Sequence, residues 1–262
     1  EYLGSQAGIR KAKMEILEGM DAKGLLLLNG DDVLLRHLDT QPEQRITYFG
    51  KSEGCPVRAE DIHQDGDTLR FRVEAGRLTF PVEMHLEGEH YVTDALAAVT
   101  VGLKLAIPHE KIAQSLAAFQ PMAGRQEIFE QNGVTIIKDC YNAGPESMAA
   151  ALSVLGNRPG RRIAVLADML ELGDAAWAEH YKIGRIAAEK ADMVFAYGPH
   201  ADRVICGTTT GGMPKTLGRP FEDREELVKA LKLAVKPGDV LLFKGSRGMH
   251  LEKVLDAFLG NL

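Results

Sequence analysis

Three short polar strings in the sequence carry side chains that could bind an anionic ligand. Residues 139–147 read Asp-Cys-Tyr-Asn-Ala-Gly-Pro-Glu-Ser, residues 168–173 read Asp-Met-Leu-Glu-Leu-Gly, and residues 244–248 read Lys-Gly-Ser-Arg-Gly. Each string follows an apolar run and precedes residues with helical spacing. A carboxylate there can accept hydrogen bonds from a ribose, and a helix N-terminus or a Lys and Arg pair can bind phosphate or carboxylate.

Each string also has an ordinary interpretation. Asn142 and Ser147 are common helix caps, Asp168 could cap a loop, and Lys244 could belong to a solvated basic turn. Ligands of open α/β sheets bind at the carboxyl ends of the strands, so three such strings at one edge favour a binding cleft. The candidate ligand-binding side chains are therefore Asp139, Asn142, Asp168, Lys244, Ser246 and Arg247.

Two further cations stand outside these strings. Lys13 lies on the apolar stripe formed by Ile9 and Leu17, where a snorkelling stem is the ordinary interpretation and a desolvated or modified amine is the functional one. Arg125 could stabilise charge on a phosphoryl group during its transfer. A surface ion pair between Arg125 and Glu127 explains that residue equally well.

The common nucleotide-binding loops are not found in the sequence. Gly50-Lys51-Ser52 resembles the end of a phosphate-binding loop, but position 45, where the first glycine should stand, holds Arg45. No predicted strand is followed by Gly-x-Gly-x-x-Gly, so the nicotinamide-type fingerprint is missing as well. The three polar strings remain the best candidates for a site.

From residue 133 onward the elements that position these strings alternate. Apolar runs are followed by stretches of helical spacing, which indicates a parallel α/β sheet. We predict strands over 134–138, 163–167, 193–196 and 240–243, and helices over 146–155, 175–190, 225–234 and 251–259.

The first part of the chain has a different pattern. Ser5 is predicted to cap a helix that continues to Met20, and Asp32 is predicted to precede a second helix. A hinge near residues 120–124 would divide the chain into domains 1–120 and 121–262. Within the first domain we predict strands over 25–28, 46–49, 69–73 and 78–82, the last three in an antiparallel patch, and helices over 94–105 and 109–119.

Composition narrows the function classes. The 262 residues include 31 Lys and Arg against 37 Asp and Glu, so the net charge is −6 and a general nucleic-acid coat is disfavoured. A hydrophobic fraction of 45% excludes a mainly disordered chain. The sequence shows neither a membrane-spanning run nor a signal peptide. The odd number of cysteines, 3, favours a reduced, cytoplasmic setting.

Taken together, the three strings resemble the C-terminal domain of the Mur ligases. The string at 168–173 is most like the branch of that family that adds D-alanyl-D-alanine. Residues 1–13 and 28–32 resemble the later half of the family's central ATPase domain. The resemblance implies an α/β fold with two parts: a partial central ATPase domain, which has a mixed sheet, an antiparallel patch and helices, and a Rossmann-like C-terminal domain.

The resemblance also implies an activity. Mur ligases are ATP- and Mg²⁺-dependent amide ligases of peptidoglycan precursor synthesis, and this branch joins D-alanyl-D-alanine to a UDP-MurNAc-tripeptide through an acyl phosphate. By resemblance, Lys13 is the carbamylated lysine that supports a magnesium ion, and Arg125 contacts the terminal phosphate. Asp139 binds the ribose, and Asn142 lies near the phosphates. The resemblance assigns the peptide substrates to Asn142, Asp168, Lys244, Ser246 and Arg247.

Two departures from the family pattern stand out. The adenine-side helix usually reads Gly-x-His-Asn-x-x-Asn; here His90 is kept, while Tyr91 and Asp94 replace the asparagines. These three residues are the candidate nucleotide-side contacts, and Tyr91 could stack on the base. The family's N-terminal substrate domain, phosphate loop, and metal-binding Glu and His are not found in this sequence. We therefore expect that this chain alone does not catalyse the full reaction.

Other functions stay open at this point. The chain could be a nucleotide- or peptide-binding module without turnover, another Mur or folylpolyglutamate-synthase-like ligase, or an α/β nucleotide-binding protein of unrelated chemistry. Under the main hypothesis the partners are the UDP-MurNAc-peptide and D-alanyl-D-alanine. We expect a monomer with no nucleic-acid partner and no membrane span.

Overall fold

The computed structural model describes residues 2–21, 23–36, 38 and 45–260 of the chain. Glu1, which begins the N-terminal string noted above, lies outside the described residues. The chain divides into two compact units, residues 3–120 and, in the main, residues 121–262. Each unit has its own sheet and its own buried core, and each is described by itself below.

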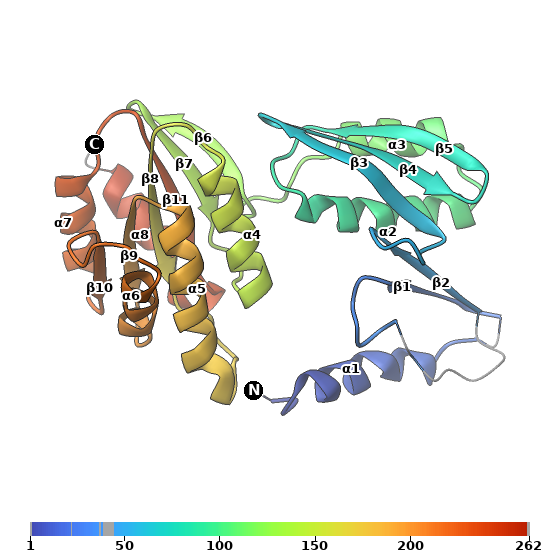
Figure 1. The fold of residues 1–262 in the computed structure, drawn as a ribbon, viewed down its shortest axis with the longest axis horizontal. Helices are drawn as coiled ribbons and strands as arrows, with labels where there is room; N and C mark the ends of the chain where they lie inside the picture. The colour runs from blue at the N-terminus through green and yellow to red at the C-terminus, as the bar shows by residue number, and fades with distance from the viewer. Residues whose placement is uncertain (1, 22, 37, 39–44, 261–262) are drawn as a thin grey trace. The chain divides into compact units, whose positions relative to one another are not determined.

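The first unit is built on a five-stranded mixed sheet (Figure 1). Strands β1, β2 and β3 pair in parallel, whereas β3, β4 and β5 pair antiparallel. The strand predicted over 46–49 therefore lies in the parallel part of the sheet and not in the antiparallel patch. Helices α2 and α3 contribute to the same buried apolar cluster as the sheet. In sheet order the strands are β1 (Leu25–Asn29), β2 (Arg45–Gly50), β3 (Val57–Asp65), β4 (Thr68–Ala75) and β5 (Leu78–Met84), and the helices are α2 (His90–Lys104) and α3 (His109–Ala117).

The N-terminal helix is shorter than predicted. Helix α1 spans Gln6–Met14, and a 3₁₀-helix over Glu15–Leu17 follows it, so the α-helix does not continue to Met20. Ser5 caps α1 as expected, because its hydroxyl accepts a hydrogen bond of 3.1 Å from the Gly8 amide. None of the described residues of α1 is buried, so its apolar stripe is not part of the core.

Of the helix predicted after Asp32, residues 33–36 form a turn, and residues 37 and 39–44 lie outside the described residues. The Asp32 carboxylate accepts a hydrogen bond of 2.7 Å from the Leu34 amide and so caps this turn. The neighbouring Asp31 carboxylate accepts the amides of Lys51 at 2.7 Å and Ser52 at 2.9 Å. The Gly-Lys-Ser string thus has an internal carboxylate as the partner of its amides.

The second unit is a six-stranded sheet in the order β10-β9-β8-β11-β7-β6. All neighbouring strands are parallel except β6, which runs antiparallel to β7 at one edge. This confirms the predicted Rossmann-like α/β class. The strands are β6 (Glu127–Gln131), β7 (Val134–Asp139), β8 (Arg161–Ala167), β9 (Met193–Tyr197), β10 (Gly218–Phe221) and β11 (Asp239–Lys244).

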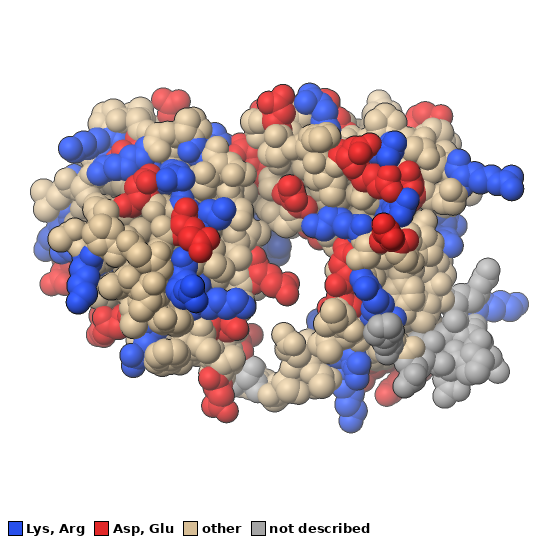
Figure 2. Space-filling model, in the orientation of Figure 1, with Lys and Arg blue, Asp and Glu red and all other residues tan. Residues whose placement is uncertain are grey.

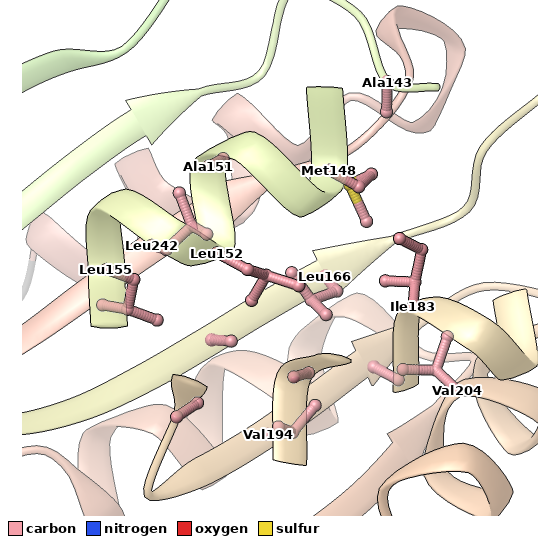
Figure 3. Close-up of a cluster of buried hydrophobic side chains, with 14 of the residues drawn as sticks. Ala143, Met148, Ala151, Leu152, Leu155, Leu166, Ile183, Val194, Val204 and Leu242 are labelled. Carbon is pink, nitrogen blue, oxygen red and sulfur yellow. The ribbon is translucent and has the colours of Figure 1, made fainter. Parts of the chain in front are cut away.

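Helices cover both faces of this sheet (Figure 1). On one face, α4 places Met148, Leu152 and Leu155 against Leu166 of β8 and Leu242 of β11 (Figure 3). The side chains of α7 and α8 pack with the opposite face. The helices are α4 (Pro145–Gly156), α5 (Ala176–Lys190), α6 (Ala201–Thr210), α7 (Arg224–Ala234) and α8 (Leu251–Leu259).

The structure also shows how charged side chains are distributed over the surface and whether a described helix could cross a membrane. Figure 2 shows acidic and basic side chains interspersed over the visible face of each unit, without a broad area of one sign. No helix in the described part of the chain is long and apolar enough to cross a membrane.

Candidate functional site

The carboxyl ends of three neighbouring strands carry the three polar strings. Strand β11 lies between β8 and β7, and its last residue, Lys244, is in register with Leu166 on one side and Asp139 on the other. The loops that follow these strands therefore leave the same edge of the sheet. This edge is where open α/β sheets bind their ligands.

A buried ion pair joins two of these strand ends. Lys244 is only 1% exposed, and its Nζ donates a hydrogen bond of 2.6 Å to Oδ2 of Asp139 and one of 3.1 Å to the carbonyl of Asn142. A buried charge needs both a counter-ion and hydrogen bonds, and Lys244 has both. Its amine thus holds the loop after β7 onto the end of β11.

Ser246 connects all three loops. Its hydroxyl accepts a hydrogen bond of 2.9 Å from the Leu170 amide and donates one of 3.3 Å to the Ala143 carbonyl. Its own amide donates a hydrogen bond of 3.1 Å to the carbonyl of Asp168. Because Ser246 is buried, these contacts fix the relative positions of the three loops.

Asp168 and two histidines form a buried polar cluster behind the second loop. Both oxygens of the Asp168 carboxylate lie 3.2 Å from the His200 amide, and burial raises the pKa of this group. His180 Nε2 accepts a hydrogen bond of 2.9 Å from the Met169 amide, so the proton of the neutral ring is on Nδ1, 2.6 Å from the Ala176 carbonyl. Burial lowers the pKa of His180.

Two guanidinium groups lie on the exposed part of the same edge. The Arg125 Cζ is 4.3 Å from the ring centroid of Tyr141, and the Arg247 Cζ is 5.7 Å from it. In the described structure Arg125 has no ion pair with Glu127, whose carboxylate instead accepts the Gly124 amide at 3.4 Å. The sequence analysis did not single out Tyr141, although it lies within the first polar string.

Cys140 is a packing residue rather than a nucleophile. Burial raises the pKa of its thiol to about 12, so the reactive thiolate is rare near neutral pH. Its Sγ lies 3.4 Å from the Phe243 carbonyl, inside the core beneath the site.

The remaining predicted residues lie in the first unit. Lys13 is exposed on α1, and among the described residues no hydrogen bond or ion pair holds its amine. His90 and Tyr91 begin α2 with their ring centroids 4.3 Å apart, and Asp94 is exposed one turn later. Within the described residues no group of three or more His, Cys, Asp and Glu side chains could hold a metal ion.

Comparison with known proteins places the chain in a family. The family model of the Mur ligase middle domain matches residues 1–102, and that of the Mur ligase glutamate ligase domain matches residues 124–247. The chain belongs to the Mur ligase family. The two Mur ligase domains correspond to the mixed sheet and the α/β sheet described above, so the resemblance found in the sequence is confirmed.

Similar proteins within the Mur ligase family are of the MurF type. The UDP-N-acetylmuramoyl-tripeptide–D-alanyl-D-alanine ligase of Bacillus subtilis (strain 168) is 33% identical over 257 residues, which cover 97% of this chain and 55% of that enzyme. MurF ligase from Thermotoga maritima in complex with ADP superposes with a TM-score of 0.84 and 27% identity, covering 99% of this chain and 58% of that one.

MurF from Acinetobacter baumannii is similar to the same extent, with a TM-score of 0.83 and 28% identity over 98% of this chain and 56% of that one. The chain thus spans little more than half the length of these Mur ligase relatives. The activity of a whole Mur ligase is therefore a proposal for this protein.

Proposed function

We propose that this chain is part of a MurF-type ligase that adds D-alanyl-D-alanine to a UDP-MurNAc-tripeptide in peptidoglycan precursor synthesis. The observation that carries the proposal is the 33% identity to such a ligase over 97% of the chain. The three loops that meet at the carboxyl edge of the second sheet support it. When bound, ATP would supply the phosphoryl group that activates the acceptor carboxylate as an acyl phosphate, with release of ADP. Attack by the amine of the dipeptide would then form the amide bond and release inorganic phosphate.

The residues of the edge divide into two groups in this proposal. Lys244, Ser246 and Asp168 have internal partners, so we infer that they hold the loops in shape around the peptide substrates. Arg125 and Arg247 are exposed and have no ion pair among the described residues, so their charges are available to a ligand. Arg125 suits a terminal phosphate, and Arg247 suits the carboxylate of the incoming dipeptide.

The nucleotide also needs contacts outside the phosphates. We infer that Asp139 binds the ribose through the part of its carboxylate that Lys244 leaves free, and that Asn142 lies by the phosphates. His90, Tyr91 and Asp94 would contact the base side. The ADP bound to the similar ligase from Thermotoga maritima supports an adenine nucleotide as the ligand.

The proposed reaction also uses Mg²⁺. The described residues do not form a metal site by themselves. Mg²⁺ is usually held by one or two carboxylates together with substrate phosphates. A carbamylated Lys13 would supply one such carboxylate. The three free cysteines fit a reducing compartment such as the cytoplasm, and we infer that the protein acts there. We also propose that it is a monomer.

Replacement of Arg247 tests the assignment of the dipeptide. In the complete protein that carries this chain, Arg247→Ala should raise the KM for D-alanyl-D-alanine by about tenfold, the value of one charge-assisted hydrogen bond. The KM for ATP should change much less. Arg219→Ala is the matched control, because Arg219 also lies over an aromatic ring, 5.3 Å from the Phe221 centroid, but on the edge strand β10. Equal increases in both KM values would contradict the assignment.

A further inference from the structure

One exposed tyrosine lies against two arginines that are far apart in the sequence. Arg125 precedes β6, Arg247 follows β11, and Tyr141 stands in the loop after β7. Both guanidinium groups lie within 6 Å of the Tyr141 centroid, the range of a cation–π interaction. Since both distances are measured to one centroid, the two Cζ atoms are no more than about 10 Å apart.

The Tyr141 ring is not needed for core packing. It is 41% exposed, and in the described structure its hydroxyl has no hydrogen-bond partner. Its backbone, in contrast, is fixed, because the Tyr141 amide donates a hydrogen bond of 3.2 Å to the Gly124 carbonyl. The residue after Gly124 is Arg125, so the backbone contact and the ring contact attach the same segment to the loop after β7.

An aromatic partner leaves the charge of an arginine available. A carboxylate would orient a guanidinium by neutralising it, whereas a ring face orients it by a weaker attraction and keeps its net charge. Within the described residues neither Arg125 nor Arg247 has an acidic partner at ion-pair distance. The two like charges are thus held near each other without compensation, which favours the binding of an anion.

We propose that Tyr141 is a positioning residue that orients Arg125 and Arg247 toward two anionic groups at once. The proposal rests on the proposed function, in which one group is a phosphate and the other is the carboxylate of the incoming dipeptide. The ring would then couple the binding of these two groups. Because both guanidinium groups pack on the Tyr141 ring, a movement of one guanidinium that shifts the ring also changes the contact between the ring and the other guanidinium.

The geometry can be tested on this chain without catalysis. We would record the side-chain NMR signals of Arg125 and Arg247 in the unaltered protein and in the Tyr141→Phe and Tyr141→Leu variants. The ring should shift the arginine δ and ε proton signals upfield in the unaltered protein and in Tyr141→Phe, and the shift should disappear in Tyr141→Leu. Signals that are the same in all three proteins would overturn the arrangement.

Binding of inorganic pyrophosphate to the same three proteins tests the role. Tyr141→Phe keeps the ring and should bind within twofold of the unaltered protein, whereas Tyr141→Leu should bind about two- to fivefold more weakly, as expected for loss of an exposed cation–π contact. Equal weakening in both variants would assign the effect to the hydroxyl and overturn the proposal. Equal binding by Tyr141→Leu and the unaltered protein would overturn it as well. The melting temperature of each variant controls for unfolding.

Steady-state ligation by the complete protein separates this inference from the proposed function. If Tyr141 positions both arginines, Tyr141→Leu should raise the KM for the dipeptide and lessen the further effect of Arg125→Ala. A complete protein that ligates normally with Tyr141→Leu overturns the inference and leaves the proposed function intact. The opposite outcome is also possible: the NMR shifts and the pyrophosphate affinities of the variants follow the expectation, but the complete protein has no ligase activity. That outcome overturns the proposed function and leaves the arginine arrangement intact.

Discussion

Lys244 and Ser246 show, at the scale of single residues, what the sequence could and could not predict. Their residue types and their position after a strand correctly indicate an edge rich in polar contacts. Their partners were beyond prediction, because Asp139 is 105 positions from Lys244 and the pair exists only when β7 and β11 become neighbours. The structure therefore gives Lys244 an internal counter-ion, whereas the sequence suggested a ligand contact or a solvated basic turn.

The buried pair leads to a prediction about stability. Lys244→Met should lower the free energy of unfolding of the second unit by about 3–5 kcal/mol, because it leaves the Asp139 carboxylate without its cation. The double variant Lys244→Met/Asp139→Asn should recover a large part of this loss, since no uncompensated charge remains. Urea unfolding followed by circular dichroism measures both. A double variant less stable than the single variant would show that the pair itself is not the cause.

At the scale of elements, the predictable helices are those with a clear apolar stripe. Helix α5 was predicted over 175–190 and spans Ala176–Lys190. Helix α6 was not predicted, because Gly207 and three consecutive threonines are poor helix formers. It forms because it packs closely on α5: a Cβ on Gly207 would lie 2.1 Å from the Tyr181 carbonyl oxygen. Tertiary packing overrides local propensity at this position.

Strands β3, β6 and β10 were not predicted, and β3 and β10 escaped prediction for similar reasons. Strand β10 has only four residues, includes Pro220, and lies at the edge of its sheet, where proline is tolerated. The alternation of strand β3 is interrupted by a register shift between Glu60 and His63. Its exposed face carries charged side chains. Cross-strand ion pairs with β4 balance them, such as Arg58 with Glu74 at 2.6 Å. These pairs, like the loop contacts of the site, depend on residues that are distant in the sequence.

The contact between α5 and the loop at 168–173 predicts a pH dependence. The folded chain holds His180 neutral, with its pKa below the ordinary value of 6.5. Below that pH the unfolded chain binds a proton that the folded chain does not, so the free energy of unfolding should fall as the pH drops from 7 to 5.

His180→Gln isolates this contribution. Its carbonyl oxygen can still accept the Met169 amide, but it does not titrate, so its unfolding free energy should depend less steeply on pH over the same range. Asp168, whose pKa is raised by burial, acts in the opposite direction in both proteins. Chemical unfolding at pH 7, 6 and 5 measures the two slopes. Parallel pH profiles would contradict the role given to His180.

At the scale of the whole molecule, the sequence indicated the two kinds of sheet, and the structure and the family models agree with it. For the second unit, the alternation of apolar runs with stretches of helical spacing after residue 133 predicts the parallel sheet. The family resemblance implied that Lys13 is held in place and carbamylated, but α1 has no buried residue among those described, and Lys13 is exposed. Its place in a site depends on contacts that the described residues do not supply.

The proposed function requires that the complete protein carrying this chain add D-alanyl-D-alanine to a UDP-MurNAc-tripeptide. The most direct measurement is mass spectrometry of the product formed by the complete protein from UDP-MurNAc-tripeptide, ATP and an equimolar mixture of D-alanyl-D-alanine, L-alanine, D-glutamate and L-glutamate. We predict one new product, the tripeptide extended by D-alanyl-D-alanine, formed with one ADP per amide bond. Extension by a single amino acid, or hydrolysis of ATP without any extended product, would contradict the account.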